Sequence, residues 1–145
     1  MTSINRTTSN NPDFISLTKL LDEELLKIYK SEQAKFDKHN ILEKSTKSIL
    51  IYDNQTPVAC GAFREIIEHQ TIEIKRMFVL SSYRSKGIGK LLLSELENWA
   101  TELKFKSAVL ETGDKQHAAL SLYKKLGYFR LPNFLHMKTC RIVFV

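Results

Sequence analysis

The chain has 145 residues, of which 43% are hydrophobic and 26% charged, a balance typical of a folded globular domain. This length predicts a single domain, and no apolar run approaches the ~20 residues that a membrane-spanning helix needs. The net charge of +6 is uneven: residues 1–71 carry 9 Lys and Arg against 10 Asp and Glu, and residues 72–145 carry 13 against 6. The second half therefore favours an anionic partner, and the absence of aromatic residues interleaved with the cations argues against nucleic acid.

The N-terminal third predicts an arm, a strand and a helix. Residues 1–12 are polar and lack a secretory apolar core, so we expect a flexible N-terminal arm before a single domain at 13–145. Phe14–Thr18 alternates weakly and predicts a strand. Residues 20–36 predict a helix, because Leu21, Leu25 and Ile28 recur on one face.

The remaining chain alternates strands with helices. Strands are predicted at residues 48–52, 58–63, 66–67, 71–79, 107–112, 128–130 and 139–145, and helices at 88–103 and 116–126. The helix at 88–103 is long enough to cross over, so the strands at 71–79 and 107–112 can pair in parallel. The order predicts an α/β (α+β) domain with a mostly antiparallel sheet. Cys60 and Cys140 lack metal-ligand spacing, so we expect no metal. Because no signal sequence is seen, we expect a cytoplasmic location, where both cysteines stay free thiols.

The most informative stretch is the turn between the strand ending at Val79 and the helix starting at Ile88. It reads Arg84-Ser85-Lys86-Gly87-Ile88-Gly89-Lys90, with two glycines and three cations. Glycines let backbone amides approach a ligand, and the first amides of a helix lack internal partners. The turn therefore predicts a phosphate site. A Walker loop is excluded because Arg84 stands where its first glycine belongs. A dinucleotide fingerprint is excluded because Leu92 stands where its third glycine belongs.

The pattern Arg84-x-x-Gly87-x-Gly89 resembles the pyrophosphate loop of the GNAT acetyltransferase superfamily, whose ligand is acetyl-CoA. The segments on either side, 73–79 and 122–128, make the match specific, and the run from Leu110 to Tyr128 looks like a bacterial branch of that superfamily. The resemblance covers residues 14–145. It implies a GNAT fold with about seven strands flanked by helices, in which the central parallel pair is splayed.

The resemblance also implies where acetyl-CoA binds. The backbone amides of residues 84–90 would hold its diphosphate, and the strand at Met77, Phe78 and Val79 would bind the pantetheine arm. The amide of Met77 or its neighbour would stabilise the thioester oxygen, often through a β-bulge that the sequence does not reveal. Gln116 stands where family members often carry Asn, so its contact with the pantetheine depends on a longer side chain.

Transfer of an acetyl group to an amine also requires a base and an acid. Glu73 is the predicted base because it lies in an apolar stretch four residues before Met77; Glu111 is the rival, and a surface pair of Glu73 with Lys75 or Arg76 is the structural alternative. Tyr123 is the predicted acid, since the resemblance places a tyrosine near the CoA sulfur. The alternative for Tyr123 is an ordinary core aromatic of an amphipathic helix.

The sequence therefore predicts an acetyl-CoA-dependent N-acetyltransferase that transfers directly to a small-molecule primary amine in a ternary complex. Two other classes stay open: a CoA-binding regulatory domain without turnover, and a small basic nucleic-acid-binding protein. The apolar strand at 139–145 also suggests a homodimer formed by strand pairing between subunits.

Overall fold

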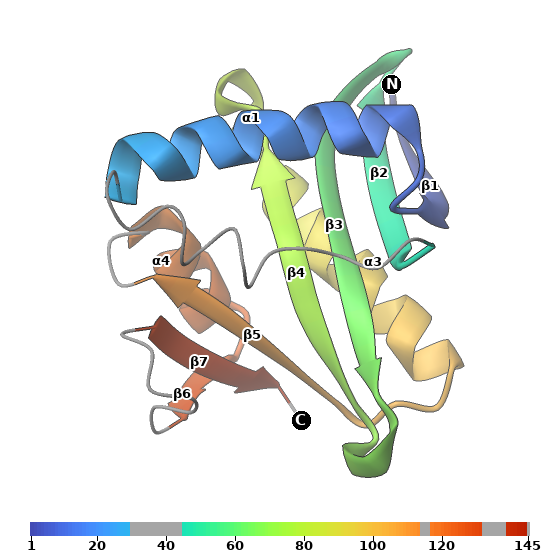
Figure 1. The fold of residues 1–145 in the computed structure, drawn as a ribbon, viewed down its shortest axis with the longest axis vertical. Helices are drawn as coiled ribbons and strands as arrows, with labels where there is room; N and C mark the ends of the chain where they lie inside the picture. The colour runs from blue at the N-terminus through green and yellow to red at the C-terminus, as the bar shows by residue number, and fades with distance from the viewer. Residues whose placement is uncertain (30–44, 114–116, 132–138, 145) are drawn as a thin grey trace.

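The computed structural model describes residues 1–29, 45–113, 117–131 and 139–144 (Figure 1). The elements in chain order are β1 (Thr2–Thr8), α1 (Pro12–Tyr29), β2 (Lys47–Asp53), β3 (Thr56–Ile66), β4 (Thr71–Val79), α3 (Ile88–Glu102), β5 (Ser107–Gly113), α4 (His117–Lys125), β6 (Phe129–Leu131) and β7 (Thr139–Phe144). Short 3₁₀ turns at η2 (Ile67–His69) and η3 (Ser81–Tyr83) follow β3 and β4.

The strands form one seven-stranded sheet in the order β1-β2-β3-β4-β5-β7-β6. The β4–β5 pair is parallel and the other neighbouring pairs are antiparallel. In Figure 1, α1 crosses one face of the sheet and α3 lies behind the other face, where it connects β4 to β5. The predicted mixed sheet with a helix-crossed parallel pair is therefore confirmed.

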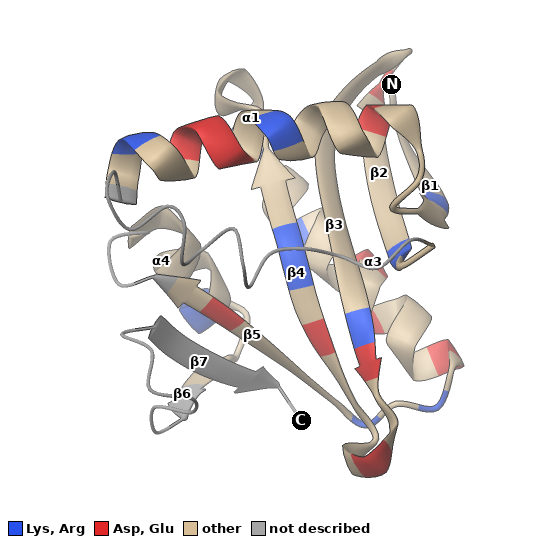
Figure 2. Cartoon of the chain, in the orientation of Figure 1, with Lys and Arg blue, Asp and Glu red and all other residues tan. Residues whose placement is uncertain are grey.

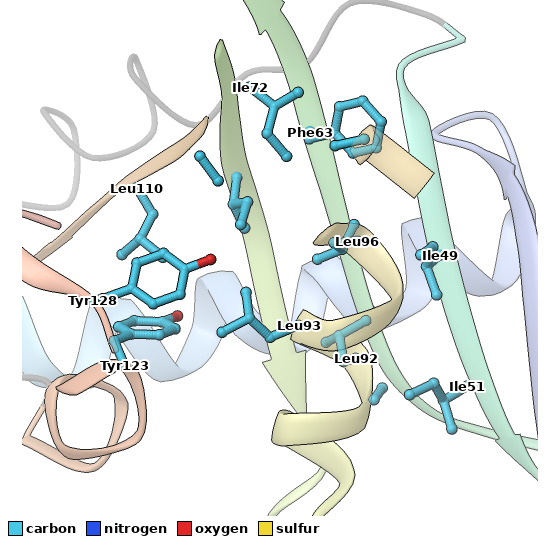
Figure 3. Packing of buried hydrophobic residues seen from close by; sticks show 14 of the residues in the cluster. Ile49, Ile51, Phe63, Ile72, Leu92, Leu93, Leu96, Leu110, Tyr123 and Tyr128 are labelled. Carbon is cyan, nitrogen blue, oxygen red and sulfur yellow. The ribbon is translucent and has the colours of Figure 1, made fainter. Parts of the chain in front are cut away.

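Two apolar clusters fix the layers. One cluster joins the sheet to α3 and α4 and includes Ile49, Ile51 and Leu96 (Figure 3). The other joins the opposite face to α1 and includes Leu50 and Phe78. Successive β2 residues thus enter different clusters, as the period of two in a strand requires. The middles of β2 and β3 are buried on both faces, so residues 49–51 and 58–63 form nearly continuous apolar runs.

The predictions of a flexible arm at residues 1–12 and of a first strand at 14–18 are wrong. Residues 2–8 form β1, which pairs along β2 from Thr2↔Asp53 to Thr8↔Lys47. Residues 14–18 lie in α1 instead, which begins when the side chain of Asn11 accepts a hydrogen bond from the amide of Asp13 at 2.9 Å. The apolar residues of α1 have helical spacing: its buried side chains are Phe14, Leu17, Leu21 and Leu25.

The last strand does not offer a free edge along its whole length. β7 pairs with β5 from Ala108↔Phe144 to Gly113↔Thr139, and Phe129–Leu131 of β6 pairs with its other side. It is an internal strand because the short β6 turns back beside it. The suggested homodimer route through this strand is therefore wrong for the segment that β6 covers.

Candidate active site

The loop after β4 has the backbone of an anion site. Ser85 and Gly87 both have positive φ, 65° and 82°, and Gly87 is the N-cap of α3 without any side-chain hydrogen bond to the helix. The loop residues Arg84, Ser85, Lys86 and Gly87 are exposed. Because no side chain caps α3, its first amides and the positive end of its dipole are left for a ligand.

The two glycines of this loop have different roles. A Cβ on Gly87 would meet no atom within 4 Å, so glycine is needed there for its left-handed backbone alone. A Cβ on Gly89 would lie 3.0 Å from Cδ2 of Leu122, which belongs to α4. Gly89 therefore lets α3 and α4 pack closely beside the loop.

Arg84 links the loop after β4 to α1, which lies on the face of the sheet opposite to α3. Its Nε donates to the carbonyl of Val79 at 2.9 Å, and its Nη2 pairs with Glu24 of α1 at 2.7 Å. The guanidinium also lies over the ring of Phe78, 5.5 Å from its centre. Of the predicted cofactor-binding residues, Gln116 lies outside the described part of the chain.

The two parallel strands, β4 and β5, stop pairing in the middle of the sheet. Parallel pairing of β4 with β5 runs from Thr71↔Ser107 to Ile74↔Leu110, and beyond it the strands diverge toward their carboxyl ends (Figure 1). The splay that the family resemblance implies is therefore present. It opens a backbone gap at Met77, where the pantetheine site is predicted.

At the same level β4 contains a β-bulge. On β3, Cys60 pairs with Phe78 and Ala62 with Lys75, so Arg76 and Met77 together face Gly61. Arg76 adopts a left-handed backbone with φ of 59°. Nothing in the sequence indicates this bulge, because an arginine seldom takes positive φ.

Two unmet polar groups flank the splay. Among the described residues, the buried side-chain atoms without a hydrogen-bond partner are Nη1 of Arg76 and Oγ1 of Thr112. Each lies two residues beyond the last parallel pair, Ile74↔Leu110. A buried donor or acceptor left unpaired costs about 1–3 kcal/mol. The guanidinium of Arg76 is held on the α1 face by Thr18 and Asp22. Thr112 lies two residues after Leu110 and so shares the α3 face, where its hydroxyl fits an amide-bearing arm of a cofactor.

Tyr123 comes to the bulge from α4. Its hydroxyl lies 3.7 Å from Sδ of Met77 and donates toward that sulfur. Figure 3 shows Tyr123 and Tyr128 side by side with their hydroxyl groups directed toward β4. Burial raises the pKa of Tyr123 to about 12, so the phenol stays protonated at neutral pH. The hydroxyl of Tyr128 instead donates to Oε2 of Glu97 at 2.5 Å.

Glu73 lies on the other face of the sheet. Its neighbours Ile72 and Ile74 belong to the cluster under α3, so by strand alternation Glu73 points to the face that carries α1. Its Oε1 accepts from Nε and Nη2 of Arg64 on β3, at 3.1 and 2.7 Å. The ion pair that the sequence offered as an alternative thus exists, but with Arg64 rather than Lys75 or Arg76.

Glu111 shares this face. Ala108 and Leu110 of β5 point to the α3 cluster, so Glu111 alternates to the α1 side with Glu73. Figure 2 shows acidic and basic residues of α1 side by side where the helix crosses the end of β4, whose middle carries basic residues. One contact in that crossing is the ion pair between Arg76 and Asp22 at 2.8 Å. The structure thus puts the predicted acid and the two candidate bases on opposite faces of the splayed pair.

Among the described residues, no group of three or more His, Cys, Asp and Glu side chains could hold a metal ion. Within the same part of the chain, no helix has both the length and the apolar character of a membrane span. Cys60 is a free, buried thiol, as predicted; the side chain of Cys140 lies outside the described part.

The sequence is similar to those of several known proteins. IAA acetyltransferase of Azospirillum brasilense is 30% identical over 115 residues, which are 79% of this chain and 75% of that protein. Probable N-acetyltransferase 14 of Xenopus tropicalis is 38% identical over 80 residues, or 55% of this chain. The matched part spans only 39% of that relative's length.

Solved structures show the same architecture. The crystal structure of a GNAT-family acetyltransferase from Staphylococcus aureus Mu50 superposes with a TM-score of 0.74 at 21% identity, covering 97% of this chain and 98% of the other. The family model described as Acetyltransferase (GNAT) family matches residues 14–128, which include the bulge, the glycine loop and Tyr123. The chain belongs to the acetyltransferase (GNAT) family.

Proposed function

We propose that the protein is an acetyl-CoA-dependent N-acetyltransferase that transfers the acetyl group directly to a small-molecule primary amine. The observation that carries the proposal is the bulge at Arg76 and Met77, which coincides with the end of β4–β5 pairing and with the hydroxyl of Tyr123. Family membership supports the acyltransferase class. Transfer to nitrogen and an amine acceptor go beyond what family membership supports and are proposed here.

In this proposal the loop and the splay hold the cosubstrate. Acetyl-CoA would supply an activated thioester and a diphosphate. The amides at residues 85–90 would bind the diphosphate at the uncapped start of α3. The arm would run along Met77, Phe78 and Val79 into the gap left by β5, where the amide of Met77 would donate to the thioester oxygen.

The proton transfers are divided between the two faces. A free alkyl amine has a pKa near ~10.4, so it must lose a proton before it attacks the carbonyl carbon. Glu73 would take that proton, directly or through a water molecule, from the α1 side. Tyr123 would give its phenolic proton to the departing thiolate from the α4 side and regain one from solvent. As one N–C bond forms and one C–S bond breaks, the nitrogen loses a second proton, which passes to solvent. No redox step occurs.

The test is thioester consumption with release of free thiol, measured with purified protein across amines, polyamines, amino acids and peptides. We expect thiol release that depends on both acetyl-CoA and one acceptor class, and a product heavier than the acceptor by one acetyl group. Calorimetry with acetyl-CoA supplies the parallel binding measurement. Binding without thiol release over the whole panel would favour a CoA-binding regulatory domain. Absence of binding would reject the proposal.

A further inference from the structure

Cys60 makes a specific contact with the backbone of the bulge. Its Sγ lies 3.5 Å from the carbonyl oxygen of Arg76 and donates to it. Cys60 is fully buried on β3, the strand next to the bulge. A buried carbonyl without a donor would carry a penalty of about 1–3 kcal/mol, and this thiol gives the carbonyl a donor where the bulge shifts the register between β3 and β4.

The contact fixes the direction of the next amide. The described part of the chain contains no cis peptide bond, so the carbonyl of Arg76 and the N–H of Met77 lie on opposite sides of one planar unit. The carbonyl is directed at the sulfur of Cys60, which lies on β3 and packs in the α1 cluster. The N–H of Met77 is therefore directed away from Cys60, at a level of β4 beyond its last parallel pair with β5. At this level of β4 the amide of Met77 can donate to the oxyanion that develops on the thioester oxygen in the proposed reaction.

The conformation needs such support. A positive φ on a residue other than glycine costs roughly 1–3 kcal/mol and persists only where neighbours hold it. Arg76 is held through its side chain by the carbonyl of Thr18 at 3.0 Å and by Asp22 at 2.8 Å, both in α1. These contacts restrain the guanidinium, whereas the contact with Cys60 acts on the peptide plane itself.

We infer that Cys60 is a positioning residue: its S–H holds the Arg76–Met77 peptide so that the amide of Met77 faces the thioester oxygen. This inference rests on the proposed function and assigns a task to a side chain that never touches the substrate. Burial raises the pKa of the Cys60 thiol to about 12, so the thiol remains a donor at every pH at which the enzyme would work.

The experiment compares Cys60→Ser, which keeps a donor, with Cys60→Ala, which removes it. Val58→Ala is the control: Val58 is equally buried on the same strand but packs in the α3 cluster, and its truncation removes more volume. We expect Cys60→Ala to lower kcat by roughly tenfold or more, since losing an oxyanion donor outright costs about 10²–10³. Affinity for acetyl-CoA should change by no more than about tenfold, the worth of one hydrogen bond. Cys60→Ser should retain most of kcat.

A second readout does not depend on turnover. The amide resonance of Met77 is followed by NMR on addition of acetyl-CoA and, separately, of CoA, which lacks the acetyl carbonyl. We expect a downfield shift of the amide proton specific to acetyl-CoA in wild type and Cys60→Ser, and its loss in Cys60→Ala. Val58→Ala should keep the shift even if its melting temperature falls.

The outcomes separate the two proposals. If wild type binds acetyl-CoA but Cys60→Ala keeps both the Met77 shift and kcat within twofold, the positioning role is overturned and the proposed function stands. If Cys60→Ser loses as much as Cys60→Ala, donation by the side chain is also rejected. If wild type binds no acetyl-CoA, the proposed function fails, and the inference fails with it.

Discussion

The hydroxyl of Tyr123 on α4 and the sulfur of Met77 on β4 meet at 3.7 Å across 46 positions of sequence. A thioether is a weak hydrogen-bond acceptor, so this phenol donates to a poor partner. Its neighbour Tyr128, with ring centres 6.0 Å apart, donates to a carboxylate instead. Of these two adjacent phenols, Tyr123 is the one that a developing thiolate could engage without breaking a strong bond.

Tyr123→Phe is expected to lower kcat by about a hundredfold, because general acids typically contribute 10²–10⁴. The dissociation constant for acetyl-CoA should stay within about twofold, since the ring keeps its packing and only a weak hydrogen bond is lost. Steady-state kinetics and calorimetry with acetyl-CoA measure the two quantities. Tyr128→Phe is the matched control and should keep kcat. Equal losses of kcat and affinity in Tyr123→Phe would reject the acid role.

The same phenol makes a pH-dependent contribution to stability. Burial raises the pKa of Tyr123 to about 12, whereas an unfolded tyrosine loses its proton near ~10. Above pH ~10 the unfolded state therefore binds fewer protons than the folded state, and the free energy of unfolding falls as pH rises. The loss from this group reaches about 2 kcal/mol by pH ~12. Below pH ~10 this group adds no pH dependence.

Urea unfolding between pH 8 and roughly pH 11.5 checks this prediction. We expect the wild-type free energy of unfolding to decline more steeply above pH ~10 than that of Tyr123→Phe. Cys60 titrates in an overlapping range in both proteins, and its contribution cancels in the difference. Tyr123 also raises the pKa of Tyr128, so part of the difference comes through Tyr128. Parallel curves for the two proteins would mean that Tyr123 is reached by solvent in the folded state.

Much of the scaffold could be predicted because its signals are local. The apolar runs at residues 48–52 and 58–63 and the helical period from Ile88 are all local patterns, and each element was found near its expected place. The parallel pairing of β4 and β5 followed from the length of the helix between them. The glycine loop was recognised from its position between a strand and a helix.

The details that shape the site depend on partners far along the chain. The bulge arises from a shift of register between β3 and β4, and its left-handed residue is Arg76, which carries no local signal. The ion pair of Glu73 with Arg64 likewise follows from their opposite places on β3 and β4. Single-strand patterns cannot reveal which residues of two strands face each other.

β1 escaped prediction for a different reason. Its residues are mostly polar and exposed, so neither period nor hydrophobicity marks them. The strand is held by backbone pairing with β2 and by Arg6, which forms a bidentate pair with Glu102 and lies 5.1 Å from the ring centre of Trp99. An edge strand of this kind gains little from burial, which is the property that sequence patterns report best.

The two loop glycines should fail differently when they are replaced. Gly87→Val forces a β-branched residue to adopt φ of 82°, at a cost of roughly 1–3 kcal/mol, and should lower acetyl-CoA affinity because the loop amides turn away. Gly89→Ala places a methyl group 3.0 Å from Cδ2 of Leu122, so it should lower the melting temperature because the side chain of Leu122 has to move to make room. Calorimetry and thermal unfolding on both variants provide the comparison. Unchanged cofactor binding in Gly87→Val would count against the loop assignment.

Glu73 can be tested as the base through the pH dependence of its loss. Glu73→Gln should lower kcat/KM for the acceptor by about a hundredfold near pH 7, where the amine is protonated and needs a base. The loss should shrink as pH approaches the amine's own pKa of ~10.4, because the acceptor then loses its proton to solvent without needing a base from the protein. Arg64→Gln should reduce kcat less, since it removes a partner of Glu73 and not the carboxylate.

Glu111→Gln is the matched variant, because Glu111 lies on the same face of the neighbouring strand. A loss that is relieved at high pH in Glu111→Gln, together with a pH-independent loss in Glu73→Gln, would move the base from β4 to β5. The two variants thus decide which of the diverging strands presents the proton acceptor. The Tyr123→Phe profile, which should show no such relief, separates removal of the amine proton from protonation of the thiolate on the opposite face.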